Sequence, residues 1–387
     1  MSEFSLNDVS RLNWASSAVG DEAGIDPYAS RSLTSDISQT AWGINHRQTP
    51  LPVPINKDHY GLTFFTRPQL NLQRANIRHA RRLHPLLTTE SKSWQRYVRC
   101  MLDPRLGRDW DASNADSSVT RNLECPLIDE KNAFIPILTN MLNSISGWPD
   151  SPSPTYTSKA GLYKEEWSMV DGNIVNYTAY DLTANFRNLK ANPIKQLFSY
   201  WCLYQSWVYD GTLMPYPDMI LSREIDYQTR IYRLILDASK TYVQQIAACG
   251  AAFPIATPEG NTFDFSIDKP YNDTNNEVSI PFKCSGFICN DDILIRTFNE
   301  TVAIFNPDMM PEAMTITHNY CVNEKPDDSK MTKIPRRYLS LFNCRGYPRI
   351  DPETFELEWY VPRSEFNDKM QALEQFEEYM QKALVSA

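Results

Sequence analysis

Glycine and histidine are scarce in this chain of 387 residues, which has 13 glycines and five histidines. Glycine-rich loops let backbone amides approach a phosphate closely, and the sequence contains neither GxGxxG nor a Walker A pattern. It also contains no HExxH and no GxSxG, the local patterns of many zinc peptidases and serine hydrolases. The common nucleotide-binding folds and these two hydrolase classes are therefore disfavoured.

Long apolar runs, an export signal and paired cysteines are also missing. The mean hydropathy is −0.46, and no run is long and apolar enough for a membrane helix, so we expect no membrane insertion. The first residues show no basic segment followed by an apolar one, so we expect the protein to be made and assembled in the cytosol. No CxxC occurs, which predicts free and mostly buried thiols at Cys100, Cys125, Cys202, Cys249, Cys284, Cys289, Cys321 and Cys344.

The charge and the aromatic content point away from a nucleic-acid wrapping protein. The formal charge is −9, from 38 basic and 47 acidic residues, so the whole surface offers no basis for DNA binding by counterion release. Aromatic residues make up 12% of the chain, and 26 prolines outnumber the 13 glycines. This balance suits strands joined by stiff, extended connections.

Residues 1–57 are predicted to form an extended N-terminal arm. They are polar, are interrupted by several prolines, and carry Trp14 and Trp42 as isolated apolar anchors. Such a segment buries too little apolar surface to offset its own ordering entropy, so we expect it to order on a neighbouring subunit or on the body of the protein. Trp14 and Trp42 are candidate partner-binding residues, and a disordered tail is the alternative.

Residues 58–165 are predicted to form an accessory region with one strand and several helices. The strand runs from Tyr60 to Pro68, and Asn71 then caps a helix that places Arg74, Arg78 and Arg82 on one face. That face is either simply solvated or a dock for an acidic partner or a nucleic-acid phosphate. Further helices are expected at 91–102 and 134–145, and the Ser/Pro run at 151–154 is the best linker candidate.

Residues 166–300 show the clearest pattern and are predicted to form the core. Leu182, Ala184 and Phe186 alternate with polar residues, which indicates a half-buried strand. Asn192 and Pro193 are typical of a helix start, because an asparagine side chain caps the free amides and proline at the first helical position has no amide to leave unpaired. The helix that follows carries an apolar face of Ile194, Leu197, Phe198, Trp201, Tyr204 and Val208, which should cover a sheet. Later strands are predicted at 225–236, 241–248 and 278–284, the first two joined by a hairpin at 237–240.

This order of elements predicts an α+β protein, mainly antiparallel, with a sandwich or barrel-like sheet and one packed helix. A doubly wound parallel sheet is disfavoured because only one helical crossover lies among the strands. Residues 301–387 are predicted to form a C-terminal extension. An apolar run at 293–305, which crosses the start of this extension, suggests a strand. Within the extension, a further strand is predicted at 356–361 and an amphipathic helix at 364–384.

The core from Ile174 to Cys289 resembles the tail-tube fold of contractile bacteriophage tails, especially the tube-like proteins of the baseplate hub. Tyr180–Arg187 resembles the strand before the family's helix, and Ile194–Tyr209 resembles that helix, with Trp207 near its end. The sequence at Cys249–Ile255 is similar to a family turn in which glycine, apolar, proline and apolar residues follow one another. Phe263–Phe265 and the strand at 276–284 complete the resemblance, which covers about a third of the chain.

The resemblance implies a structural virion protein, and the chain is long for a plain tube subunit. We therefore expect a baseplate or tail-tube-type ring protein that joins or initiates the tube, in a hexameric ring that is assembled in the host cytoplasm and contacts other tail and baseplate proteins. DNA would pass through such a ring without specific binding. A neck or peripheral baseplate protein is the alternative, and a cell-wall-degrading tail enzyme is a remote one.

No catalytic residue, cofactor or metal site is expected. The carboxylates at Glu165, Glu166, Asp291, Asp292, Glu356 and Glu358 are candidates for glycoside hydrolysis only because acids are common. His318 and Cys321, with Cys284, Cys289 and Cys344, could supply zinc ligands, but their spacing matches no paired-knuckle pattern.

Overall fold

The computed structural model describes residues 60–88, 90, 92–105, 125, 128–150, 153–172, 178–237, 239–258, 276–310, 325–342 and 345–372. The chain divides into two compact units, each of which is built from segments distant in sequence. Unit 1 comprises Met1–Leu62, Leu234–Ile246 and Asn290–Ala387, and unit 2 comprises Thr63–Arg233 and Ala247–Cys289. The division at residues 57, 165 and 300 expected from the sequence stays a prediction.

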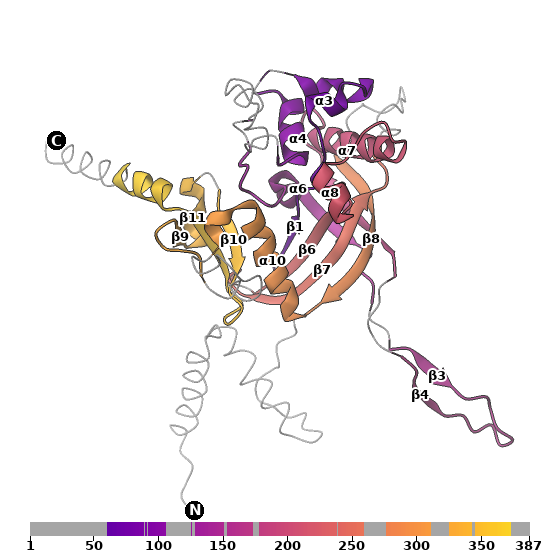
Figure 1. The fold of residues 1–387 in the computed structure, drawn as a ribbon. Coiled ribbons are helices and arrows are strands. Elements are labelled where there is room, and N and C mark those ends of the chain that lie inside the picture. Colours follow the sequence, from indigo (N-terminus) through magenta and orange to yellow (C-terminus); the bar gives the residue numbers. More distant parts are fainter. Residues whose placement is uncertain are drawn as a thin grey trace, which may run out of the picture. The chain divides into compact units, whose positions relative to one another are not determined.

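A six-stranded sheet is the main architectural element (Figure 1). Its strand order is β1-β6-β7-β8-β5-β2, and the pairs β2–β5, β5–β8 and β7–β8 are antiparallel. The strands are β1 (Tyr60–Phe65), β2 (Leu142–Ser146), β5 (Tyr180–Arg187), β6 (Thr229–Leu236), β7 (Val243–Pro254) and β8 (Glu277–Cys289). The expected α+β fold with a mainly antiparallel sheet is thereby confirmed.

Strands β5 and β8 form because their apolar residues alternate, as the sequence predicts. The register places Phe186 opposite Val278, and the next inward pairs are Ala184 with Ile280 and Leu182 with Phe282. All six side chains are fully buried. Period-two burial on paired strands produces one continuous apolar face of the sheet.

Strand β6 starts later than the sequence suggests and changes phase along its length. It begins at Thr229 rather than Ile225, because the carbonyl of Tyr227 accepts a hydrogen bond of 2.9 Å from the Trp201 indole and so ties that stretch to the helix. The buried side chains are those of Thr229 and Ile231 at the start of the strand, and those at the even positions 232, 234 and 236 further on. Ile235, predicted to share the face of Ile231, is only half-buried.

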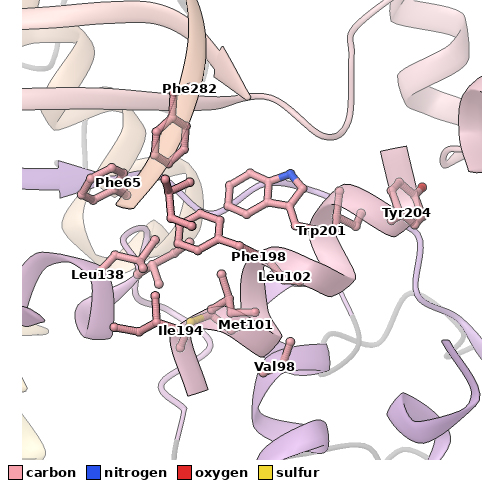
Figure 2. Packing of buried hydrophobic residues seen from close by; sticks show 14 of the residues in the cluster. Phe65, Val98, Met101, Leu102, Leu138, Ile194, Phe198, Trp201, Tyr204 and Phe282 are labelled. Carbon is pink, nitrogen blue, oxygen red and sulfur yellow. The ribbon is translucent and has the colours of Figure 1, made fainter. Parts of the chain in front are cut away.

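Helix α7 (Pro193–Tyr209) packs on this sheet through the apolar face expected from its spacing. The buried face consists of Ile194, Leu197, Phe198, Trp201 and Tyr204, all fully buried. Phe198 lies next to Phe282 of the sheet, and their rings meet edge to face (Figure 2). The Phe198 ring centroid lies 5.7 Å from that of Phe282 and 5.6 Å from that of Phe186. Burial of large aromatic side chains between helix and sheet is the main stabilising contribution here.

The helix start at α7 is confirmed, but its predicted cap is wrong. Pro193 occupies the first helical position, where its missing amide leaves no donor unpaired. Asn192, however, has a φ of 53°, and its side chain makes no capping hydrogen bond. Its Oδ1 instead accepts a hydrogen bond of 2.7 Å from the Asn188 side-chain amide, so the asparagine stabilises the preceding turn.

Two further expectations in unit 2 need correction. The helix predicted after Asn71 is divided into α3 (Arg74–Ile77) and the 3₁₀ helix η1 (Arg81–Leu87), because Ala80 between them has non-helical backbone angles. The helix predicted over 134–145 is α6 (Pro136–Met141), and the chain then enters β2, whose pairing with β5 overrides local propensity. The remaining helices of the unit are α4 (Trp94–Leu102) and α8 (Pro217–Ser222).

The residues Cys249–Ile255, expected to form a turn, instead continue strand β7 as far as Pro254. Opposite Gly250 lies Gly286, which has a φ of 71°, a conformation that glycine adopts without strain. A Cβ at Gly250 would lie 3.3 Å from the Gly286 carbonyl oxygen. The two glycines therefore allow close approach of the two backbones within the sheet.

Unit 1 contains a helix where the sequence suggests a strand. Residues Asp292–Phe305 form α10, and the Asp291 side chain caps it by accepting a hydrogen bond of 3.0 Å from the amide of Ile293. The run is rich in β-branched residues, which favours strand. Its buried residues nevertheless follow helical spacing, namely Leu294, Ile295, Phe298, Thr301, Val302 and Phe305, together with Asn299.

A three-stranded sheet completes unit 1, in the order β10-β11-β9. Its strands are β9 (Met331–Ile334), β10 (Tyr347–Ile350) and β11 (Leu357–Pro362), with the 3₁₀ helices η3 (Pro307–Met309) and η6 (Arg336–Phe342) beside them in sequence. Asn299 of α10 donates to the Ile350 carbonyl at 2.8 Å and accepts from its amide at 2.9 Å. These two hydrogen bonds of the Asn299 side-chain amide fix α10 against the edge strand β10.

The predicted strand at 356–361 is confirmed as β11, and the predicted C-terminal helix is confirmed over 363–372. Phe366 stacks on Phe342 at 6.2 Å between ring centroids. The remainder of that helix lies outside the described residues, as does the whole N-terminal arm.

Candidate functional site

A hairpin built by β3 (Thr155–Thr157) and β4 (Ser168–Val170) extends away from the six-stranded sheet (Figure 1). The two strands are antiparallel, with Tyr156 opposite Met169. The amide of Ser158 donates to the Trp167 carbonyl at 2.9 Å, and the Trp167 amide donates to the Ser158 hydroxyl at 3.1 Å. These hydrogen bonds hold the two strands together, although the hairpin has no core of its own.

The hairpin exposes large apolar side chains in unusual number. Leu162 and Tyr163 at the tip are 90% and 87% exposed, and Trp167 is 59% exposed. Tyr156, Met169 and Val170 are exposed as well. A cluster of exposed apolar and aromatic side chains on one projecting element is typical of a protein-binding surface.

The tip of the hairpin is shaped by Glu165. Its Oε2 accepts a hydrogen bond of 2.7 Å from the amide of Tyr163, and the Gly161 amide donates to the Glu165 carbonyl at 3.0 Å. A Cβ at Gly161 would lie 2.1 Å from the Glu165 carboxylate, so glycine leaves room for this turn. Glu165, considered above as a hydrolase carboxylate, therefore has a structural contact in the turn.

The sequence interpretation missed this hairpin and placed a linker at its start. Ser153 and Pro154 lead into β3, and the two residues before them lie outside the described residues. The available signal was the pair of short aromatic segments around Tyr156 and Trp167, separated by a glycine. Because every apolar residue of the hairpin faces solvent, no burial pattern marked its strands.

The structure places Arg74, Arg78 and Arg82, the predicted partner-binding arginines, at the surface on α3 and η1. Arg81 beside them is also exposed. The opposite side of this segment is anchored in the core by residues at a spacing of three, namely Ile77, Ala80, Leu83 and Leu86, all fully buried. The arginines thus lie close together in sequence on a firmly supported segment, although the single helix predicted for them does not form.

A buried polar network lies in the same unit, under the loops that join these helices. Asp103 accepts hydrogen bonds from the Tyr216 hydroxyl at 2.8 Å and from the Leu72 amide at 2.9 Å. Burial is the main reason that the pKa of Asp103 is raised to about 6. Burial also raises the pKa of Tyr216 above its usual range. The network joins the chain after β1 to the chain after α7.

A second buried pair connects Tyr204 of α7 with Asp226. The Tyr204 hydroxyl donates to Asp226 Oδ2 at 2.5 Å and accepts from the Asn71 amide at 3.0 Å. Burial raises the pKa of Asp226 from its ordinary value and also raises that of Tyr204. These carboxylates are enclosed by structural partners, so their raised pKa values reflect packing rather than a reaction centre.

Other predicted features fall partly outside the described residues. Trp14, Trp42, His318, Cys321 and Cys344 all lie outside them, so the partner-binding role of the two tryptophans stays a prediction. Among the residues that the structure describes, no group of three or more His, Cys, Asp and Glu could hold a metal ion. The described cysteines are free thiols, at Cys100, Cys125, Cys202, Cys249, Cys284 and Cys289.

Comparison with known proteins decides the family. The family model described as "Putative phage tail tube protein" matches residues 13–377, which is nearly the whole chain. The chain belongs to this family. As a tail tube family member it is a structural protein of the phage tail, which agrees with the resemblance seen in its core sequence. No curated protein matches the chain by sequence.

Several solved structures from contractile injection systems share a local likeness with this tail tube family member. A chain of the PVC sheath/tube terminator in the extended state is 14% identical, with a TM-score of 0.23, over 41% of this chain and 87% of that one. A chain of the anti-feeding prophage tube-terminating cap is 13% identical, with a TM-score of 0.25, over 41% and 82% of the two chains. A chain of the anti-feeding prophage baseplate is 10% identical, with a TM-score of 0.22, over 38% and 78%.

In the part of this tail tube family member that the structure describes, no helix combines the length and the apolar character needed to cross a bilayer.

Proposed function

We propose that this phage tail tube family protein forms a ring at one end of the tube of a contractile tail, where it joins or initiates the tube. The observation that carries the proposal is the β3–β4 hairpin, whose apolar surface is not covered by the part of the chain that the structure describes. Insertion of this hairpin between neighbouring subunits or against an adjacent ring would bury that surface. Burial of each large side chain contributes about 1.5 to 3 kcal/mol before ordering costs.

The edge of the six-stranded sheet supports a ring. Strand β2 is the last strand in the sheet order, and most of its side chains are exposed or half-buried. An unpaired edge strand is a template for pairing with another chain unless it is covered. Head-to-tail pairing between identical subunits closes into a ring when the rotation per subunit divides a full turn, and six subunits is the number we propose.

The two units support a place at a tube end rather than along its length. Unit 1 has its own small core, formed by Ile334, Leu339, Phe342 and Val361, and this core adds a second folded body to the sheet of unit 2. A repeated tube subunit needs only contacts to its own kind. A tube-end protein also contacts other tail and baseplate proteins, for which a second body and the N-terminal arm offer surface. Trp14 and Trp42 would anchor that arm.

Labelled tails test this position. A small epitope tag placed after residue 387 and visualised with gold-coupled antibody should mark one end of each isolated tail. Label distributed along the whole tube would contradict a tube-end role and indicate the repeated tube subunit. Label at the collar between head and tail would favour the neck, and label on the outer baseplate would favour a peripheral component.

A further inference from the structure

Four exposed arginines, Arg74, Arg78, Arg81 and Arg82, form a surface that we call the cationic face. Within the described residues none of these four arginines makes an ion pair with a carboxylate. The one side-chain hydrogen bond that the four make there joins Arg78 Nε to His79 Nε2 at 3.0 Å. Their positive charges are therefore not neutralised by the part of the chain that the structure describes.

Other arginines of the same protein serve internal structure. Arg67 is buried and donates to backbone carbonyls, among them that of Met101 at 3.0 Å. Arg105 pairs with Asp218 at 2.7 Å, and in unit 1 Arg349 meets a buried glutamate. The cationic face differs from these because its guanidinium groups point to solvent and remain available for a partner.

The charge around the cationic face is opposite to that of the rest of the chain. Residues 60–102 contain seven arginines, one lysine and one glutamate, a charge of +7. Because the whole chain carries −9, the remaining residues carry −16. A second copy of the chain therefore offers a large excess of negative surface to the cationic face of the first.

The cationic face is held rigidly, which favours binding. Asn76, between Arg74 and Arg78, accepts from the Met214 amide at 3.1 Å and donates to its carbonyl at 3.0 Å. This contact fixes α3 to the loop after α7 through the backbone of Met214. A surface that is ordered before binding loses less entropy when it binds.

We propose that the cationic face binds an acidic surface on a second copy of this chain. Two cationic faces would repel one another, so they cannot meet across a two-fold axis. The contact joins the cationic face of one copy to a different surface of the next, and when it is repeated head to tail it builds rings or stacks of rings. The inference rests on the proposed ring and names one surface that forms it.

Nucleic acid fits the cationic face less well than a second copy does. Four exposed arginines would neutralise few phosphates, and the −16 carried by the rest of the chain would repel a duplex beyond them. An acidic protein surface can match a small patch of opposite charge without bringing further negative charge against the molecule. The test must therefore also detect DNA, because DNA bound by the cationic face in place of a second copy would contradict the proposal.

The test uses the full chain and two variants of equal charge. Reversal of Arg74, Arg78 and Arg82 to Glu changes the net charge from −9 to −15. Reversal of three exposed basic residues elsewhere, Lys190→Glu, Arg230→Glu and Arg345→Glu, gives the same −15 and is the matched control. Sedimentation velocity at about 50 mM and about 500 mM NaCl measures self-association, because salt screens exposed charge pairs.

We expect the cationic-face variant to self-associate at least tenfold more weakly than the control at low salt, and we expect high salt to weaken the wild type and the control. We also expect a tagged cationic-face variant to retain wild-type protein, because its acidic surface is intact and can meet the wild-type cationic face. Unchanged melting temperatures of both variants would show that the effect is on association.

Three results would overturn the inference. Equal loss of association in both variants would show that total charge, not the cationic face, is responsible. Normal association of the cationic-face variant would show that a second copy is not the partner of the cationic face, while leaving the ring intact. If that variant had also lost binding to a 30-base-pair duplex in a gel-shift assay, DNA would be the partner instead. Monomeric wild-type protein under every condition would contradict the ring itself.

Discussion

At the scale of single residues, Trp201 is the side chain on which the packing of α7 depends most. It is fully buried, stacks on Phe198 at 5.9 Å between ring centroids, and donates a hydrogen bond from its indole to Tyr227. We expect Trp201→Ala to lower the free energy of unfolding by about 3 to 5 kcal/mol, because it leaves a large cavity and an unpaired carbonyl. Urea denaturation measures this.

The matched control for Trp201→Ala is Tyr209→Ala at the end of the same helix, where the side chain is 91% exposed. This change should alter the free energy of unfolding by about 0.5 kcal/mol or less. If the two substitutions cost the same, the account of helix packing is wrong.

Gly147 is required for a close approach between two strands of the sheet. It has a φ of 102°, and a Cβ there would lie 2.3 Å from the Asp181 carbonyl oxygen of β5. Gly211 also has a positive φ, 71°, but a Cβ there would have no atom within 4 Å. We therefore expect Gly147→Ala to cost clearly more stability than Gly211→Ala, which should cost about 1 to 2 kcal/mol from backbone strain alone.

Thermal unfolding of the two glycine variants side by side measures this difference. The φ of 102° at Gly147 lies further from the left-handed region of L-residues than the φ of 71° at Gly211, so the difference reports this additional strain together with the contact with β5. Equal losses would show that the sheet can move away from the added methyl group.

Asp103 should give the stability of the protein an identifiable dependence on pH. Burial raises its pKa in the folded state from 3.8 to about 6, so between these values the folded protein holds a proton that the unfolded chain has released. The contribution of Asp103 therefore decreases as pH rises from about 4 to about 6, by up to about 3 kcal/mol. Below pH 4 both states are protonated and the contribution is constant.

Comparison with Asp103→Asn isolates this effect from the other carboxylates. The pKa of Asp218 beside Arg105 is lowered and shifts stability in the opposite direction, and so does that of Asp327. The variant should gain stability relative to wild type as pH rises from 4 to 6.5 in urea denaturation series. A constant difference between the two proteins over that range would contradict the raised pKa.

At the scale of elements, the β3–β4 hairpin is expected to contribute to assembly and not to folding. Replacement of residues 155–170 by a short Gly/Ser turn removes a hairpin whose side chains are almost all exposed, so the melting temperature should change by only a few degrees. Self-association measured by light scattering should be lost. Loss of folding would instead show that the hairpin packs on the sheet, and intact assembly would remove its proposed role.

How well each element could be predicted depended on whether its own residues determine its burial. Apolar residues recur at regular spacing in helix α7 and in strands β5 and β8. That spacing predicted whether each is a helix or a strand, and the apolar positions predicted which face is buried. The run at 293–305 was predicted as a strand because of its apolar character, while the Asp291 cap and the contact of Asn299 with β10 favour a helix. The cap is local, but the contact with Ile350 of β10 comes from a residue distant in sequence.

The candidate surfaces were predicted unequally for the same reason. Arg74, Arg78 and Arg82 were identifiable because an exposed cationic cluster is visible in sequence, although its helix is divided at Ala80. The hairpin was not, because its apolar side chains are exposed among the described residues and so leave no period that points to a core. We propose that a second molecule gives those side chains a buried environment.

At the scale of the whole molecule, this tail tube family protein offers three surfaces for the proposed assembly. They are the edge strand β2, the hairpin and the cationic face, and all three belong to unit 2. We propose that unit 1 supplies a second body for contacts with other tail proteins, and that identical copies assemble head to tail into a closed ring.

Electron microscopy of the purified full-length protein, alone and mixed with isolated tail tubes, tests this claim most directly. Class averages of negatively stained particles should show closed rings of one size with six-fold symmetry, and rings should bind one end of the added tubes. Particles that remain single subunits in both samples, or open filaments without closed rings, would contradict the account.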